Sequence, residues 1–215
     1  MLTFFQFVND FVYLYPLLMS FVWVIGSLIF YWRLERRSNT LPPIKEFPFF
    51  SVLVPCHNEE AQINNTVVQL LELDYPKYEI ILIDDGSTDK TASVIHNLSE
   101  KYEQVRAAYL KENQGKAAAL NIGCLIARAD LILTIDADAL LDPKALKWIA
   151  WHFIKFPRAG AVTGNPRVLN RTTLLAKIQT GEYSTIIGLI KRTQRILGKV
   201  LTVSGVIAAF RRQAL

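Results

Sequence analysis

The feature that most constrains this chain is a stretch of about 22 residues, Phe11 to Trp32, that contains no charged side chain. An α-helix of this length, rising about 1.5 Å per residue, would cross the roughly 30 Å hydrocarbon core of a bilayer. A cleaved signal peptide is the alternative, but the basic start is missing, and bulky Phe30, Tyr31 and Trp32 stand where a cleavage site needs small residues. We therefore expect residues 1–37 to form an N-terminal transmembrane anchor.

The charges beside this stretch predict where the rest of the chain lies. No Lys or Arg precedes it, whereas Arg33, Arg36 and Arg37 follow it at once, and basic residues favour the cytoplasmic side of a span. We expect a single span in the inner (plasma) membrane, with the remaining chain in the cytoplasm. Cys56 and Cys124 have neither the number nor the spacing of a disulfide or metal framework, which fits reduced cytosolic thiols.

The basic residues of the chain narrow the choice of partners. The net charge of +5 suits an anionic membrane surface or phosphate ligands, and it is also compatible with a simple solubility role. No aromatic-studded basic stripe is present, so we expect no nucleic-acid partner. Lys191, Arg192, Arg195 and Lys199 lie on an apolar stretch, which indicates a helix near the membrane interface or an acceptor channel, or equally the solvated face of a core helix.

The remaining sequence predicts a stiff linker and one α/β domain. Three prolines between residues 38 and 48 disfavour both helix and strand. From residue 49 to residue 215, short apolar runs alternate with longer helical patterns, which is typical of a mainly parallel sheet. The expected strands are 50–55, 79–83, 105–110 and 131–135, and the expected helices are 61–73, 90–102, 116–127 and 143–156.

Polar residues gather where these strands are expected to end. In parallel sheets ligands bind beyond the carboxyl ends of the strands. Pro55 to Glu59 follow the first strand, Asp84 to Asp89 follow the second, and Asp136 to Asp138 follow the fourth. We expect a ligand site at this edge of the sheet.

Two pairs of carboxylates stand out among these residues. Asp84 and Asp85 are adjacent and repel each other unless donors or a cation lie between them. Asp136 and Asp138, two apart along an extended strand, point the same way and can face one ion. Mg²⁺ and Mn²⁺ favour one or two carboxylates plus phosphate oxygens, so this pair predicts a metal bridging the pyrophosphate of a sugar nucleotide. An isolated Asp-x-Asp is more often a surface turn.

Other polar residues have a structural interpretation beside the functional one. Residues Ser87 to Asp89 are typical of a loop and a helix N-cap. Gly115 and Lys116 open a helix where free N–H groups and the positive helix end stabilise an anion, although a solvated lysine explains them equally well. His57 is given a packing role and no catalytic one.

Taken together, the motifs resemble the N-terminal half of family 2 glycosyltransferases. The resemblance rests on Val54-Pro55-Cys56-His57-Asn58-Glu59, Asp84 to Asp89, Asn113 to Lys116 and Asp136 to Asp138, in this order. More particular motifs resemble members that polymerise N-acetylglucosamine into biofilm exopolysaccharide; they are Val162 to Arg167, Lys177 to Tyr183, Gly188 to Gln194 and Thr202 to Val206.

The resemblance implies a GT-A-type, Rossmann-like domain that transfers N-acetylglucosamine from its UDP derivative with inversion. Around the nucleotide sugar it places Pro55, Asn58, Glu59, Asp84, Asp85, Lys116 and Asp136. It places Asp138 and Asp136 at a Mg²⁺ or Mn²⁺ ion, and Ser204 and Gly205 on the acceptor side. The implied partners are the UDP-sugar, the growing polysaccharide, the lipid bilayer and a small accessory membrane subunit.

The chain departs from the family pattern in one respect. Processive members carry a Thr-Glu-Asp whose Asp is the general base and a Gln-x-x-Arg-Trp that binds the nascent chain, and neither occurs here. A metal-bound carboxylate is a poor base, so no residue of this chain is assigned that role. We expect a C-terminally incomplete domain that binds donor weakly but does not polymerise it.

Several other interpretations compete with this one. Ala139 and Leu140 do not match the haloacid-dehalogenase pattern after an Asp-x-Asp, and the turn after the first strand lacks the Gly-x-Gly-x-x-Gly of a Rossmann dehydrogenase. A non-catalytic membrane scaffold remains an alternative, because a fold alone does not establish activity. So do hyaluronan, chitin and cellulose synthases, which share the donor half.

Overall fold

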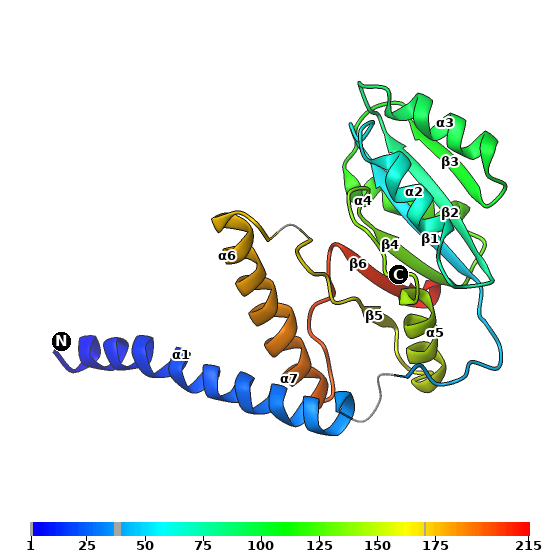
Figure 1. Cartoon of the computed structure of the whole chain (residues 1–215). Coiled ribbons are helices and arrows are strands. Elements are labelled where there is room, and N and C mark those ends of the chain that lie inside the picture. The colour runs from blue at the N-terminus through cyan, green and yellow to red at the C-terminus, as the bar shows by residue number, and fades with distance from the viewer. Residues whose placement is uncertain (1, 37–39, 170) are drawn as a thin grey trace. The chain divides into compact units, whose positions relative to one another are not determined.

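The computed structural model describes residues 2–36, 40–169 and 171–215, which form two compact units (Figure 1). One unit, here the helical unit, comprises Met1–Thr40 and Asn165–Thr202, and the other, the sheet unit, comprises Leu41–Gly164 and Val203–Leu215. Arg37, counted above toward the orientation of the anchor, and the first two linker residues lie outside the described residues. The domain boundaries expected from the sequence stay a prediction.

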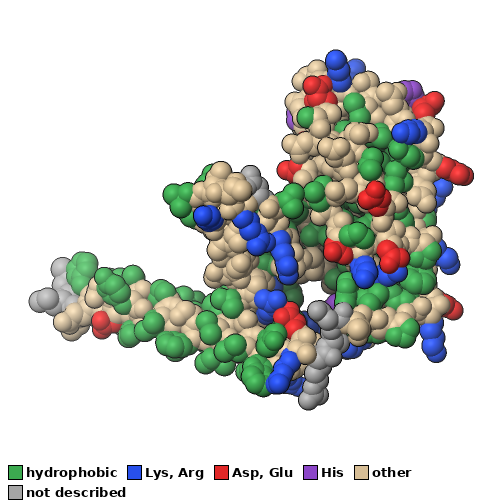
Figure 2. Space-filling model, viewed as in Figure 1, with side chains coloured by type: hydrophobic (Ala, Val, Ile, Leu, Met, Phe, Trp, Pro, Cys, Tyr) green, Lys and Arg blue, Asp and Glu red, His purple; other side chains and the backbone are tan. Residues whose placement is uncertain are grey.

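The helical unit begins with the expected apolar helix. Helix α1 spans Leu2–Phe30 and continues into a π-helical turn, η1, at Tyr31–Glu35. By length and composition the helix over Thr3–Glu35 is able to cross a membrane, with a mean hydropathy of 1.9 and only 11% of its most apolar window buried. Apolar side chains cover the visible face of α1, and charged ones gather at its C-terminal end (Figure 2).

A second long helix packs against α1 within this unit. It consists of α6 (Leu174–Tyr183), the π-helical segment η2 (Ser184–Ile190) and α7 (Lys191–Ile196). The Thr193 hydroxyl donates to the Trp23 carbonyl at 2.9 Å, and a Cβ at Gly26 would lie only 2.3 Å from the Thr193 methyl. Arg192 pairs with Glu35 at 3.0 Å. The two helices approach closely because Gly26 has no side chain.

The sheet unit contains a six-stranded, mainly parallel sheet, which confirms the predicted fold class. The strands are β1 (Phe50–Cys56), β2 (Tyr78–Asp85), β3 (Val105–Leu110), β4 (Leu131–Ile135), β5 (Ala161–Thr163) and β6 (Ile207–Arg211). Their order is β3-β2-β1-β4-β6-β5. The first four strands are parallel, and β6 runs antiparallel to both β4 and β5. The four predicted strands are thus confirmed, and β5 and β6 are additional.

Helices cover both faces of this sheet. They are α2 (Ile63–Leu71), α3 (Thr91–Lys101), α4 (Lys116–Ile126) and α5 (Ala145–Lys155), with a short 3₁₀ helix, η3, at Arg212–Ala214. Successive strand side chains point to opposite faces. Val52 and Val54 of β1 therefore join one core with α2, α3 and α5, whereas Leu53 joins the other core with α4. The described part of the linker has no helix or strand, and Phe47 packs edge-on against Tyr75.

A buried carboxylate, Glu79 of β2, ties together three segments at the base of the sheet. It is 5% exposed and accepts hydrogen bonds from the Ser51 hydroxyl at 2.6 Å, the Arg128 N–H at 2.8 Å and the Arg106 guanidinium at 2.9 Å. Burial alone would raise the pKa of Glu79, but these hydrogen bonds and the Arg106 charge together lower it. The ionised form is therefore part of the folded structure.

The lowered pKa of Glu79 predicts that acid destabilises the fold. Ionised Glu79 contributes its whole stabilisation to the free energy of unfolding when the pH is above 4.5, the ordinary pKa of the group. This contribution is lost as the pH falls through the lowered pKa of Glu79 in the folded protein. The Tm of the full chain, followed by circular dichroism, should fall as the pH drops below 4.5, and Glu79→Gln should weaken this dependence. Glu103→Gln removes an exposed carboxylate and should leave the dependence intact, so equal slopes in both variants would contradict the role of Glu79.

Candidate active site

The sheet topology creates one crevice at the carboxyl ends of its strands. From β1 the chain proceeds to β2 on one side, whereas β4 pairs with β1 on the other side. Such a switch in strand order leaves a space between the two exits, which is where α/β sheets bind ligands. The exit of β1, residues 55–59, and the exit of β4, residues 136–138, therefore lie on adjacent strands. Pro55 comes after the end of the β1–β4 ladder, where its missing N–H costs no hydrogen bond to β4.

Asp84 and Asp85 are the last two residues of β2 and do not follow the strand as expected, because β2 continues its pairing with β3 through both of them. They are only 4% and 3% exposed. Asp85 Oδ1 accepts from the Gln114 N–H at 2.8 Å, and Asp84 Oδ1 accepts from the Ser87 N–H at 3.3 Å. Backbone donors thus stabilise both carboxylates in this buried position.

The loops after β1 and β2 hold each other through Asn58. This residue has a left-handed backbone, with φ of 57°, and its side-chain oxygen accepts from the Thr88 N–H at 2.9 Å. Its own N–H donates to the Ser87 hydroxyl at 3.0 Å. Asp89 accepts from the Thr91 N–H at 2.9 Å at the start of α3. Ser87, Thr88 and Asp89 therefore shape the loop, as their structural interpretation predicts.

His57 connects three strand exits, a role that the sequence did not reveal. Its Nδ1 lies 2.9 Å from the Asp85 carbonyl, and its Nε2 lies 3.0 Å from Asn113 Nδ2 and 3.3 Å from Asn58 Nδ2. The carbonyl only accepts, so Nδ1 carries the proton and Nε2 accepts from the amide groups. Asn113 is fixed in turn because its oxygen accepts from the Gly115 N–H.

Asp136 and Asp138 lie in a turn rather than on an extended strand, which corrects the geometry assumed above. Strand β4 ends at Ile135, and the Ala139 N–H closes a turn onto the Asp136 carbonyl at 3.1 Å. The expected strand span is confirmed. Residues two apart point the same way only along an extended strand. This argument does not apply to Asp136 and Asp138, because they come after the end of β4.

Lys116 reaches across the crevice to the exit of β4. Its ammonium group pairs with the Asp136 carboxylate and donates to the Gly205 carbonyl at 3.1 Å. The Asp136 N–H donates to the Val206 carbonyl at 3.2 Å, and the Ser204 N–H donates to the Thr163 hydroxyl at 2.8 Å. The sequence showed only a small-residue turn at Ser204 and Gly205, and the structure brings this turn beside Lys116.

Asp138 is exposed and opens into a groove beside α2. The groove has a volume of about 460 Å³ and is also lined by Gln62, Asn65, Thr66 and Gln69. The Thr66 hydroxyl donates to the Ala137 carbonyl at 2.5 Å and so fixes the turn between the two aspartates. Asp138 thus presents its carboxylate to a space that is large enough for a small ligand.

The exits of β1 and β4 share an excess of negative charge. The pKa of Glu59 is raised by partial burial and then by Asp138, Asp89 and Asp136. Such mutual repulsion disfavours several ionised carboxylates together and favours a bound cation. Among the described residues, no group of three or more His, Cys, Asp or Glu is arranged to hold a metal by itself. A cation at Asp138 and Asp136 would therefore take further ligands from a phosphate or from water.

Sequence comparison agrees with these features. The family model for glycosyl transferase family 2 matches residues 51–215. Poly-β-1,6-N-acetyl-D-glucosamine synthase from Staphylococcus epidermidis is 39% identical over 210 residues, covering 96% of this chain and 51% of that protein. The same enzyme from Staphylococcus aureus (strain COL) is 42% identical over 213 residues, covering 97% and 51%. The chain spans about half the length of these curated relatives.

Solved structures show the same fold. A mannosyltransferase from Pyrobaculum calidifontis, in complex with GDP-Man and Mn²⁺, superposes with a TM-score of 0.63 and 25% identity, covering 92% of this chain and 55% of that chain. Residues 1–349 of S. aureus TarS, in complex with UDP, superpose with a TM-score of 0.50 and 27% identity over 58% of this chain and 38% of that chain. With its crevice, its carboxylates and the family match over residues 51–215, the chain belongs to glycosyl transferase family 2.

Proposed function

We propose that this chain supplies the donor-binding half of a membrane-bound, inverting glycosyltransferase that uses UDP-N-acetylglucosamine to make poly-β-1,6-N-acetylglucosamine. Identities of 39% and 42% to two synthases of this polymer support the choice of sugar and product. The observation that carries the proposal is that Asp85 accepts from the N–H of Gln114, two residues before Lys116, and that Lys116 pairs with Asp136, two residues before Asp138 at its groove. Synthesis of hyaluronan, chitin or cellulose is a less favoured alternative, because both identities are to synthases of poly-β-1,6-N-acetylglucosamine.

The geometry supports distinct roles for the residues at the crevice. Asp85 is buried and fixed by Gln114, so it is suited to accept a hydrogen bond from the uracil without moving. Pro55, Asn58, Glu59 and Asp84 shape the same rim. Lys116 begins α4, where its charge and the helix N-terminus favour a diphosphate. Ser204 and Gly205 lie beside Lys116 and are proposed to face the acceptor.

Asp138 is the better of the two proposed metal ligands. Asp136 already pairs with Lys116, whereas Asp138 is exposed to the groove. A divalent cation held there would neutralise charge on the diphosphate leaving group. Either Mg²⁺ or Mn²⁺ fits this oxygen-donor site, and the Mn²⁺ bound by the related mannosyltransferase supports a metal of this class. The residues of this chain hold and orient the donor, and none is assigned as the general base.

We also propose that α1 anchors the protein in the plasma membrane, with the sheet unit in the cytoplasm. The length and exposure of α1 support an anchor, and Arg33 and Arg36 at its end support this orientation. The partners are then the UDP-sugar, the growing polysaccharide, the bilayer and a small accessory membrane subunit. A scaffold that only retains the fold is the rival proposal.

Binding of UDP to the full chain tests the proposal. In the presence of Mn²⁺ the chain should bind UDP, and removal of Mn²⁺ by a chelator should weaken binding. Asp138→Ala should raise the Kd by roughly tenfold or more, since a ligand that bridges metal and phosphate contributes charge-assisted contacts. Isothermal titration calorimetry measures both effects directly.

Asp89→Asn is the matched control for Asp138→Ala. It removes a neighbouring negative charge that acts on Glu59, yet its side-chain oxygen still accepts from the Thr91 N–H. UDP binding should therefore stay within about twofold of the wild type, because a screened charge at a distance has a small effect. No UDP binding by the wild-type chain would favour the scaffold, and equal losses in both variants would refute the metal role of Asp138.

A further inference from the structure

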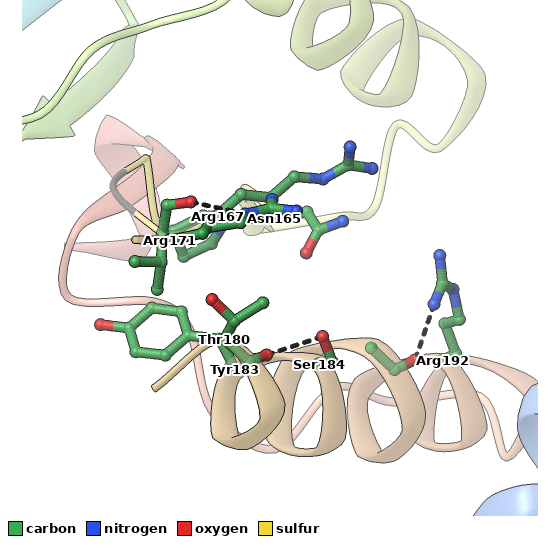
Figure 3. Close-up of a pocket in the computed structure, with 10 residues that line it drawn as sticks. Asn165, Arg167, Arg171, Thr180, Tyr183, Ser184 and Arg192 are labelled. Atoms are coloured by element: carbon green, nitrogen blue, oxygen red, sulfur yellow. Dashed lines mark hydrogen bonds between the residues drawn. The ribbon is translucent and has the colours of Figure 1, made fainter. Parts of the chain in front are cut away.

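A pocket also lies within the helical unit. Residues 165–168 and Arg171 line a cavity of about 260 Å³ together with residues of the helix α6–η2–α7. We call it the arginine pocket; its polar lining includes Asn165, Arg167, Arg171, Thr180, Ser184 and Arg192. Figure 3 shows the loop residues on one side and the helix residues on the other, with the hollow between them.

The arginine pocket carries positive charge that the described residues do not balance. Arg192 pairs with Glu35, but among the described residues neither Arg167 nor Arg171 forms a salt bridge. Among the described residues, Arg171 donates only to the Val168 carbonyl, at 3.1 Å, and no carboxylate lines the cavity. Guanidinium groups that line a cavity without a carboxylate create a site for an anion.

Another polar group of the pocket suits the oxygens of a phosphate. Planar guanidinium groups bind phosphate oxygens in pairs, and hydroxyl or amide groups complete the contacts. The Asn165 amide supplies such a donor, whereas the hydroxyls of Thr180 and Ser184 already donate to the Ala176 and Thr180 carbonyls at 2.7 Å. A cavity of about 260 Å³ has room for a phosphate with a small substituent, whereas it is small for a nucleotide diphosphate sugar.

The surroundings of the pocket indicate a lipid source for this phosphate. Residues 165–202 contain seven basic residues and one acidic residue. On α6, Leu174, Leu175 and Ile178 are 76%, 67% and 60% exposed. Exposed apolar residues beside basic ones are typical of a helix at the surface of an anionic membrane. The same unit contains α1, the proposed anchor.

We propose that the arginine pocket binds a phosphate group, supplied by the headgroup of an anionic phospholipid. Arg167 and Arg171 contact the phosphate oxygens, the Asn165 amide completes the site, and the exposed leucines of α6 lie against the acyl boundary. The site itself does not depend on the transferase proposal. Its lipid source rests on the membrane insertion of α1 proposed above, which extraction of membranes with carbonate tests separately.

Lipid retention by the full chain tests this site. The chain, purified in mild detergent, is incubated with phosphatidylglycerol or phosphatidylcholine, and bound lipids are counted by native mass spectrometry. The wild type should retain phosphatidylglycerol in preference to phosphatidylcholine. The double variant Arg167→Gln and Arg171→Gln should retain roughly tenfold less, because two charge-assisted contacts are lost.

The matched control is Lys177→Gln with Lys199→Gln. It removes the same charge from exposed positions of the same unit, outside the pocket, and should retain lipid within about twofold of the wild type, as expected for screened surface charges. Arg167→Lys with Arg171→Lys keeps the charge but loses the guanidinium fork, so retention should fall to an intermediate level. This second variant decides the question if the glutamine variant does not fold.

Inorganic pyrophosphate is the second probe, and it tests for a soluble source of the phosphate. If no lipid is retained selectively but pyrophosphate raises the Tm of the wild type and not of the arginine variant, the phosphate site stands with a soluble source. The proposal is overturned if neither probe depends on Arg167 and Arg171. It is also overturned if the lysine control loses lipid as strongly as the arginine variant, since general surface charge would then explain binding.

Discussion

Gly86→Ala is expected to destabilise the sheet unit by several kcal/mol, about 3 or more, because it combines a steric clash with a strained backbone. Gly86 has φ of +61°, and a Cβ there would lie 2.4 Å from the Glu112 carbonyl carbon and 2.5 Å from the Asn113 nitrogen. These atoms belong to the backbone, so no side-chain rotation relieves the contact. The exits of β2 and β3 would have to separate, which would also break the hydrogen bond between Asp85 and Gln114.

Thermal unfolding and UDP titration measure the two consequences of this change. Gly181→Ala is the matched control, since a Cβ at this position in α6 meets nothing within 4 Å. It should leave stability unchanged or raise it by up to about 1 kcal/mol through helix propensity. A Gly86→Ala chain with a wild-type Tm would show that the two exits are not packed as closely as the structure has them.

Asp85→Ala is expected to weaken UDP binding by roughly a hundredfold, which is more than the effect of Asp138→Ala. The carboxylate is 3% exposed and already fixed by the Gln114 N–H at 2.8 Å. Its loss removes the proposed contact to the base and leaves the part-buried Gln114 N–H without its acceptor, which costs about 0.5–1.5 kcal/mol on its own. Calorimetric titration gives the affinity, and the Tm gives the structural part.

Asp85→Asn separates these two effects. Asparagine retains an oxygen that accepts from Gln114, so stability should recover most of the loss, while the missing charge should keep UDP binding weak. Asp74→Asn, which removes a carboxylate paired with Lys147 at 2.6 Å, serves as control and should leave UDP binding unchanged. Wild-type affinity in Asp85→Ala would remove Asp85 from the proposed nucleotide site.

The parts of the fold that depend on local pattern could be predicted from the sequence. Short, continuous apolar runs indicate β1 to β4, because each strand places successive side chains in two separate cores and is buried on both faces. The span of β4, Leu131–Ile135, is confirmed to the residue. Strand β6 could not be found in this way, since its five residues, Ile207–Arg211, include two alanines and an arginine and form no apolar run typical of a strand.

The same limit of local pattern applies to the site. Parallel strand exits explain why Asp85 and Asp136 were expected near one ligand. The pairing of Lys116 with Asp136 and Gly205 depends on how three distant segments meet, and no local pattern encodes it. The bridging position of His57 was missed for the same reason. The turn at Asp136–Ala139 could not be distinguished from a longer strand by spacing alone.

The close packing of Gly26 against Thr193 has a consequence for the order in which the protein assembles. Trp23 and Thr193, which share a hydrogen bond, are 170 positions apart. Helix α1 is synthesised before its partner helix, which follows only after all of residues 41–164, and these build most of the other unit. The sheet unit gains most of its strand pairing from segments made in between, whereas α1 must wait for its partner. During synthesis, α1 is thus made well before it can complete its contacts.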